Sequence, residues 1–234
     1  IPFEIGTTEL PQEWADSVFC YRYGEYEKKI KKAYNKLNDY KMYSDFVTSF
    51  CALEALEDWE LNPEAVFCRN DADFEVKFYD ISIAGREVQE WMQPLVKAKG
   101  IACFGLIQSN INGTWKYLVK LYHEIGSFDK AEFGPSVQLE FTHNSQENDV
   151  IENYFFDYAL KKGKVLVDVL LSEEGGRFYH EQNRNVIISV DYKTIPPLPD
   201  NYAWLEFGTL NQLGQNSHCL NIQLRNLLSL IKMV

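Results

Sequence analysis

The sequence has no long uncharged hydrophobic run and no excess of positive charge. A helix that crosses a bilayer needs about 20 consecutive apolar residues, whereas the longest apolar runs, 165–171 and 227–231, are short and are interrupted by Asp168 and Ser229. The 34 acidic residues outnumber the 23 basic ones, which gives a net charge of −11. Wide contact with nucleic acid or anionic lipid requires a basic surface. The sequence therefore predicts no nucleic-acid partner and no membrane partner.

Cysteine is scarce and scattered. The five cysteines include no Cys-x-x-Cys pair, and this dispersed, odd-numbered set favours unpaired thiols in a reducing compartment over zinc sites or disulfides. The printed sequence also opens without a signal-like segment. These features predict a cytoplasmic protein.

Three common catalytic signatures are missing as well. The sequence contains no Gly-x-Ser-x-Gly, no P-loop and no dinucleotide fingerprint, which removes the commonest hydrolase, kinase and dehydrogenase interpretations. What it does have is the composition of a globular protein, with 46% hydrophobic and 24% charged residues among 234. A chain of this length can bury a substantial core.

Hydrophobic periodicity predicts helices at both ends of the chain. Apolar residues recur at helical spacing from Tyr26, and a second helix is expected from an N-cap at Ser44 to Leu56. Another helix is expected over 149–160, and a last one at the C-terminus. The apolar stripes of the first and last helices are Ile30, Ala33, Leu37, Tyr40, Leu220, Leu224, Leu227 and Ile231.

The middle of the chain alternates apolar and polar residues, which is typical of half-buried antiparallel strands. The alternating segments are 74–78, 115–121 and 137–141. Segments 100–107 and 164–171 are more continuously apolar, which favours central strands. Helices packed on a mixed, mostly antiparallel sheet define an α+β fold. We expect an N-terminal helical segment over residues 1–60 and a second unit over residues 61–234.

The densest polar cluster spans residues 172–185, between two apolar stretches. A β-hairpin with positive φ angles at Gly175-Gly176 would explain the glycines, but not the many titratable side chains around them. Arg177 suits a pyrophosphate, because guanidinium groups bind phosphate oxygens in pairs. The candidates for proton transfer are Glu173, Glu174, Tyr179 and His180. We favour a functional site over a purely structural hairpin.

A second cluster spans residues 86–95. Arg86 is spaced to pair with Glu90 on a helical turn, which would be a structural role. Trp91 is either a core residue or a platform on which a nucleobase stacks. The cluster is thus open to a structural and to a binding interpretation.

The same cluster resembles part of the Nudix box, whose carboxylates hold magnesium. The box is incomplete, because Phe78 and Trp91 stand where it has glutamates and Ala72 stands where it has a glycine. A hard cation without these carboxylates lacks its oxygen ligands. We therefore predict no catalytic metal.

Taken together, these segments resemble the NDP-hexose 2,3-dehydratase family, both in their residues and in their order along the chain. The resemblance runs from about Phe46 to the C-terminus, and its most specific string is Ser-Glu-Glu-Gly-Gly-Arg-Phe at 172–178. The other matching segments are 86–95, 117–119, 134–138, Tyr202 with Trp204, and Asn221 with 225–228. The family implies a Nudix-like module without Nudix metal chemistry.

The resemblance implies a lyase that dehydrates an NDP-4-keto-6-deoxyhexose, first of all dTDP-4-keto-6-deoxyglucose, in deoxysugar biosynthesis. The C4 ketone acidifies the C3 proton, so a base can remove it. The C2 hydroxyl then leaves with the help of an acid, and the product is a 3,4-diketo-2,6-dideoxy sugar. No hydride moves, so no cofactor is expected.

The resemblance also distributes the binding roles. Arg86, Arg177 and Arg225 are expected to bind the pyrophosphate. Trp91 or Trp204 is expected to stack on the nucleobase. The residues expected to bind the sugar hydroxyls are Gln93, Gln138 and Asn221. Family members commonly carry two tandem repeats, whereas this sequence has the length of one, which implies a homodimer. A Nudix-like nucleotide-sugar hydrolase and a non-catalytic nucleotide-sugar-binding protein remain as alternatives.

Overall fold

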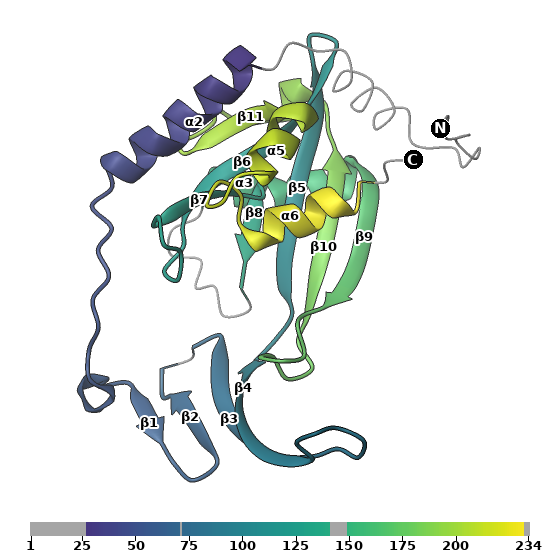
Figure 1. The fold of residues 1–234 in the computed structure, drawn as a ribbon. Coiled ribbons are helices and arrows are strands. Elements are labelled where there is room, and N and C mark those ends of the chain that lie inside the picture. The colour runs from purple at the N-terminus through teal and green to yellow at the C-terminus, as the bar shows by residue number, and fades with distance from the viewer. Residues whose placement is uncertain (1–26, 71, 141–148, 232–234) are drawn as a thin grey trace.

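The computed structural model of the protein describes residues 27–70, 72–140 and 149–231 (Figure 1). The expected helix start at Tyr26 and the expected strand residue Phe141 lie outside these described residues. Strands form one sheet of four and one of seven, mostly antiparallel, with helices packed against the larger sheet. This arrangement confirms the α+β class.

The small sheet is an antiparallel meander of β1 (Trp59–Leu61), β2 (Ala65–Cys68), β3 (Phe74–Ser82) and β4 (Glu90–Ala98). The strand predicted over 74–78 is confirmed as the first half of β3. Among the described side chains of this sheet, only Ala65 and Leu95 belong to the buried hydrophobic core. The small sheet therefore has little core of its own.

The large sheet contains β5 (Ala102–Ile111), β6 (Thr114–His123), β7 (Ala131–Gly134), β8 (Val137–Leu139), β9 (Lys164–Ser172), β10 (Gln182–Ser189) and β11 (Tyr202–Glu206). Its main order is β11-β6-β5-β10-β9, with β7 paired to β6 and β8 paired to β5. β5 and β10 are parallel, while the other pairs are antiparallel. The strands predicted over 100–107 and 115–121 are confirmed, and β5 is central as expected.

Helices cover both faces of the large sheet (Figure 1). One face carries α2 (Glu27–Met42), α5 (Phe207–Gly214) and α6 (Ile222–Ser229), and the other carries α3 (Val150–Tyr154), a π-helical turn (Phe155–Ala159) and α4 (Leu160–Lys162). The ring of Phe155 lies so close to β5 that a Cβ at Gly105 would come within 2.5 Å of it. The middle of β5 therefore requires glycine.

The helix predicted from Ser44 is wrong. Ser44 does accept a hydrogen bond from the Phe46 N–H (3.0 Å), but residues 44–52 are not helical and only a short 3-10 turn follows, over Leu53–Ala55. The ring of Phe46 stacks on His123 of β6 instead, with 4.7 Å between centroids. Helical periodicity alone is weak without an apolar surface to bury the stripe.

Three further local expectations are wrong. Residues 83–89 connect β3 to β4 and Glu90 begins a strand, so Arg86 and Glu90 share no helical turn. The 164–171 segment forms β9, an edge strand, because apolar content does not report how many neighbours a strand has. Gly175 and Gly176 have no positive φ angle, whereas His180 has φ 52°. The connection from β9 to β10 is nine residues long, so it needs no tight two-residue turn.

Residues 173–181 form this connection, here called the 173–181 loop, and they join the two sheets. The Val96 N–H donates to the Arg177 carbonyl (2.7 Å), and the Tyr179 N–H donates to the Val96 carbonyl (2.8 Å). The ring of Tyr79 on β3 stacks on Tyr179 with 4.4 Å between centroids. The loop thus holds the small sheet against one end of the large sheet.

Every helix within the described residues falls short of the length and hydrophobicity that a membrane-spanning helix needs.

Candidate active site

A cavity of about 550 Å³ lies where the 173–181 loop, both sheets and α6 meet. The loop lines it with polar side chains, and Val96 and Phe104 line it from β4 and β5. Gln223 enters from the first turn of α6. The volume lies in the range of small-molecule sites, about 300–1,000 Å³.

Carboxylates dominate the polar lining of this acidic cavity. The five are Asp73, Glu140, Glu173, Glu174 and Glu181. Burial and then the charge of Glu173 raise the pKa of Glu181. Glu140 reaches solvent at the cavity rim but is largely surrounded by protein, and this burial, followed by repulsion from Asp73 and Glu181, raises its pKa. The acidic cavity therefore favours proton binding on some of its carboxyl groups.

Glu173 is held in place by Asn183, the second residue of β10. Asn183 Nδ2 donates to Glu173 Oε1 at 2.6 Å, and the Asn183 side chain is buried. The Glu173 N–H donates to the Glu181 carbonyl at 3.0 Å, across the base of the loop. Backbone and side chain of Glu173 are thus both fixed.

Three side chains that line the acidic cavity carry a buried oxygen with no hydrogen-bond partner among the described residues. These atoms are Glu181 Oε2, Asn183 Oδ1 and Gln223 Oε1. Buried polar atoms in native proteins are nearly always paired. A ligand with several hydroxyl groups would supply the missing donors.

Arg177 and Glu174 form an ion pair at the rim of the acidic cavity, with 2.8 Å between Nη2 and Oε2. Both side chains are mostly exposed, and exposed ion pairs contribute only about 0–1 kcal/mol to stability. A phosphate group could therefore replace the Glu174 carboxylate on Arg177 at little cost.

A second cavity, of about 610 Å³, adjoins the first and shares Glu173 and Glu181 with it. Tyr179 and His180 line this second cavity and not the acidic one, and their rings stack with 4.1 Å between centroids. The four proton-transfer candidates therefore do not share one cavity. Glu173 borders both cavities, and Glu174 borders only the acidic cavity. Tyr179 and His180 border only the second cavity.

Trp91 and Gln93 of β4 hold the 173–181 loop through hydrogen bonds. Gln93 Nε2 donates to the Gly176 carbonyl at 2.6 Å, and Trp91 Nε1 donates to Gln93 Oε1 at 2.9 Å. Arg86 is exposed in the 83–89 connection and lies outside the residues that line either cavity. The structure thus brings two residues of this cluster to the loop and leaves Arg86 away from it.

Asn221 and Gln138 lie behind the acidic cavity. Asn221 caps α6 through Oδ1, and its Nδ2 donates to Glu124 Oε1 (2.9 Å) and Gln138 Oε1 (3.0 Å). Its side chain is only 2% exposed. This network fixes the turn that carries Gln223 into the cavity. Arg225 is exposed one turn later, with its Nε 3.4 Å from the Asn221 carbonyl.

Trp204 lies elsewhere. It belongs to β11, two strands from β5, which corresponds to about 10 Å across the sheet. It lines a separate pocket of about 460 Å³ together with Lys29, Lys32 and Lys36 of α2. The structure does not bring Trp204 to the acidic cavity.

Sequence reasoning missed five polar residues that line the acidic cavity, namely Asp73, Glu140, Glu181, Asn183 and Gln223. Glu181 and Asn183 fall inside the 172–185 cluster, so the local density of polar residues was an available signal for them. Glu140 and Gln223 come from distant segments, and their local patterns carry no comparable signal. Only the fold brings them to the loop.

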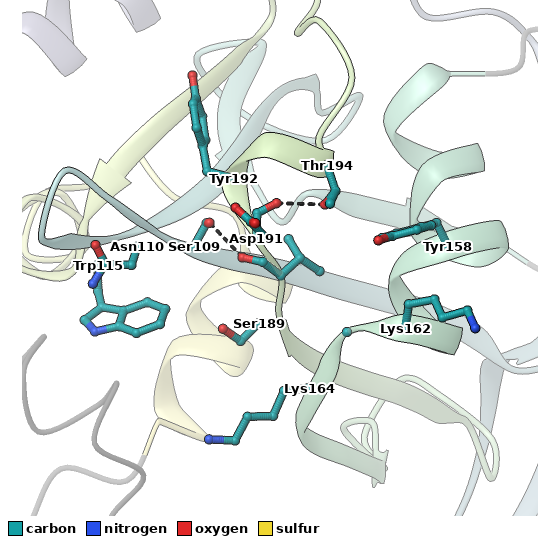
Figure 2. Close-up of a pocket in the computed structure, with 12 residues that line it drawn as sticks. Ser109, Asn110, Trp115, Tyr158, Lys162, Lys164, Ser189, Asp191, Tyr192 and Thr194 are labelled. Atoms are coloured by element: carbon teal, nitrogen blue, oxygen red, sulfur yellow. Dashed lines mark hydrogen bonds between the residues drawn. The ribbon is translucent and has the colours of Figure 1, made fainter.

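A pocket of about 410 Å³ lies at the opposite end of the large sheet (Figure 2). Aromatic residues Trp115, Tyr158 and Tyr192 and the amine of Lys162 line it. Two of its hydroxyl groups bind the backbone, since Ser109 Oγ donates to the Val190 carbonyl and Thr194 Oγ1 to the Asp191 carbonyl, each at 2.7 Å. We call it the aromatic pocket.

Within residues 27–70, 72–140 and 149–231, no group of three or more His, Cys, Asp or Glu side chains is arranged to hold a metal ion.

Similar proteins point to one family. Two of them are named dTDP-4-dehydro-6-deoxy-alpha-D-glucopyranose 2,3-dehydratase. One, from Streptomyces violaceoruber, is 29% identical over 161 residues, which are 68% of this chain and 36% of that protein. The other, from Saccharopolyspora spinosa, is 27% identical over 192 residues, which are 80% of this chain and 39% of that protein. The chain thus spans less than two fifths of the length of these relatives.

Solved structures similar in fold include a Nudix hydrolase from M. smegmatis, at 12% identity and a TM-score of 0.36, over 65% of this chain and 91% of that chain. An Ap4A hydrolase from C. elegans, also at 12% identity, has a TM-score of 0.32 over 53% of this chain and 89% of that chain. Similarity this low says nothing about activity.

The family match is much more extensive. The sequence model described as NDP-hexose 2,3-dehydratase matches residues 31–231, which include both sheets, the 173–181 loop and α6. The chain therefore belongs to the NDP-hexose 2,3-dehydratase family.

Proposed function

We propose that this chain is a hydro-lyase that removes the C2 hydroxyl of an NDP-4-keto-6-deoxyhexose, with dTDP-4-keto-6-deoxyglucose as the first substrate to test. The names of the relatives support the substrate class. The observation that carries the proposal is the Glu173 carboxylate, held by Asn183 at 2.6 Å on the wall of the acidic cavity.

Glu173 is the base in this proposal. The C4 ketone acidifies the C3 proton, and the carboxylate removes it to leave an enolate. General-base catalysis by a positioned side chain contributes about 10²–10⁴-fold to the rate. Asn183 serves as a positioning residue, because it keeps one Glu173 oxygen fixed and so directs the other.

Negative charge then develops on the C4 oxygen. The first turn of α6 borders the acidic cavity, and a helix N-terminus favours negative charge. The amide of Gln223 in the same turn is a donor for this oxygen, and such donors stabilise oxyanions strongly in an enclosed site. The C2 hydroxyl leaves as water, and the resulting enol tautomerises to the 3,4-diketo sugar.

The pyrophosphate binds at the rim in this proposal. Arg177 exchanges Glu174 for a phosphate, and Arg225 is a second cation near the first turn of α6. Gln93 and Trp91 act through the loop that they hold, and Asn221 and Gln138 act through α6. The homodimer stays a prediction, to be tested by sedimentation.

The test is to incubate the purified chain with dTDP-4-keto-6-deoxyglucose and follow products by mass. Loss of water from the intact nucleotide sugar supports the dehydratase. Release of a nucleoside monophosphate would indicate a hydrolase, and bound but unchanged ligand would indicate a binding protein. Either of these results contradicts the proposal.

A further inference from the structure

Glu181 faces Glu173 across the base of the 173–181 loop. The two residues are joined through their backbones at 3.0 Å, and both side chains border both cavities. Glu181 Oε2 is buried and has no hydrogen-bond partner among the described residues. Two carboxyl groups therefore enclose one site, and only Glu173 is hydrogen-bonded by Asn183.

We infer that Glu181 is the catalytic acid that protonates the departing C2 hydroxyl, an assignment that rests on the proposed function. Glu173 takes the C3 proton, and the electron pair of the enolate then forms the C2–C3 double bond. The C2–O bond breaks, and the oxygen takes the Glu181 proton and leaves as water. Glu173 ends as a carboxylic acid and Glu181 as a carboxylate, so the protein keeps its number of protons. The substrate has lost a hydrogen from C3 and a hydroxyl from C2, which together equal one water.

The other candidate acids around the two cavities suit this step less well. Asp73, which precedes β3, carries no buried oxygen that lacks a hydrogen-bond partner. Glu174 is exposed at the rim and paired with Arg177. Glu140 is also at the rim and exposed. His180 stacks on Tyr179 and borders only the second cavity. Glu181 alone combines a position next to the proposed base with a buried oxygen open to a new partner.

The charges around Glu181 support a proton donor. Its pKa is raised by burial and then by Glu173 on the loop. Glu140, which follows β8, is close enough for Glu181 to raise its pKa in turn, and Asn183 on β10 is neutral. When Glu173 accepts the C3 proton, its charge disappears and the repulsion that holds the proton on Glu181 weakens. The acid thus becomes stronger at the step that needs it.

The decisive variant is Glu181→Gln, compared with Glu64→Gln, an exposed glutamate between β1 and β2. We expect Glu181→Gln to lose water about 100-fold more slowly than the wild type, in line with general-acid catalysis. In D₂O it should still place deuterium at C3 of recovered substrate, because Glu173 is intact. Glu64→Gln should match the wild type in both measurements.

A substrate with fluorine in place of the C2 hydroxyl separates an acid from a structural role. Fluoride leaves without a proton, so Glu181→Gln should eliminate it within about threefold of the wild-type rate. The wild type should lose activity as pH rises with the hydroxyl substrate, and keep it with the fluoro substrate. This pH comparison needs no variant, so it decides the matter even if Glu181→Gln fails to fold.

The outcomes separate the two proposals. A wild type that neither loses water nor exchanges the C3 proton overturns the proposed function, and the role of Glu181 with it. An active wild type whose Glu181→Gln variant dehydrates at a similar rate overturns only the role of Glu181. The role of Glu181 is also overturned if Glu181→Gln eliminates fluoride as slowly as it eliminates water. It is overturned as well if wild-type activity on the fluoro substrate falls with pH as it does on the hydroxyl substrate.

Discussion

The two ends of the large sheet carry pockets of comparable size and opposite chemistry. The acidic cavity, of about 550 Å³, contains Glu140 and Glu181, whose pKa values are raised by burial and then by neighbouring carboxylates, and buried oxygens without a partner among the described residues. The aromatic pocket, of about 410 Å³, contains rings, lysines and two hydroxyl groups that already bind the backbone, those of Ser109 and Thr194 (Figure 2). One sheet thus separates the groups proposed for proton transfer from groups that bind the backbone. The comparison predicts that activity depends on the first end and stability on the second.

The largest expected difference concerns turnover. Glu173→Gln in the acidic cavity should lower kcat by about 10²–10⁴-fold, because the proposed base is lost. Asp191→Asn in the aromatic pocket should change kcat less than about threefold, because Asp191 serves as an N-cap for the 3-10 helix Tyr192–Thr194 and asparagine caps as well. Steady-state kinetics on dTDP-4-keto-6-deoxyglucose measures both. Equal losses would abolish the distinction between the two ends.

Stability should depend more on the aromatic pocket than on the acidic cavity, the reverse of the order expected for turnover. A Cβ at Gly163, in the aromatic pocket, would lie 2.7 Å from the Ala159 carbonyl oxygen and 2.9 Å from Ile188 Cγ1. Gly163→Ala should therefore destabilise the fold by about 1–3 kcal/mol, the usual cost of overpacking. A Cβ at Gly175 on the loop would have no atom within 4 Å among the described residues, so Gly175→Ala should leave Tm unchanged.

Thermal unfolding of the two alanine variants, followed by circular dichroism, tests this order. A Tm for Gly175→Ala as low as that of Gly163→Ala would mean that the loop carries stability as well as chemistry.

The sequence predicts the elements whose apolar pattern is satisfied by neighbouring structure. The stripes of α2 and α6 are buried at Ala33, Leu37, Leu224 and Leu227, as helical spacing indicates. The stripe after Ser44 has the same spacing, but Phe50 remains fully exposed and no helix forms. Spacing shows which face an element would bury, and does not show whether another element covers that face.

The same limit applies to the site. Glu173, Glu174 and Arg177 lie within one short segment, so a local cluster of titratable residues was enough to find them. Gln223 and Glu140 reach the acidic cavity only because α6 and the end of β8 pack beside the loop. Trp204 belongs to one of the matching family segments, but its strand, β11, lies two strands from β5 in the sheet. Contacts between distant segments are a property of the fold and leave no local pattern.

The smallest expected effect concerns the stability cost of the acidic cavity itself. Folding raises the pKa of Glu140, first through burial and then through the carboxylates around it. A carboxyl group whose pKa is higher in the folded state stabilises the fold below its unfolded pKa, and this contribution is lost as pH rises through the folded pKa. The charged Glu140 therefore destabilises the protein at neutral pH.

Glu140→Gln should accordingly raise Tm slightly at pH 7, by at most about 2 °C, because the side chain reaches solvent and its charge is partly screened. At pH 4 the difference should vanish, because the wild-type carboxyl is then protonated. Asp157→Asn, on the exposed side of the helical segment beside the aromatic pocket, should leave Tm unchanged at both pH values. An equal rise for both variants would mean that total negative charge, and not repulsion within the acidic cavity, limits stability. A rise for Glu140→Gln alone would place the cost at the end of the sheet where the proposed proton transfers occur, as expected when a site keeps carboxyl groups close together for chemistry.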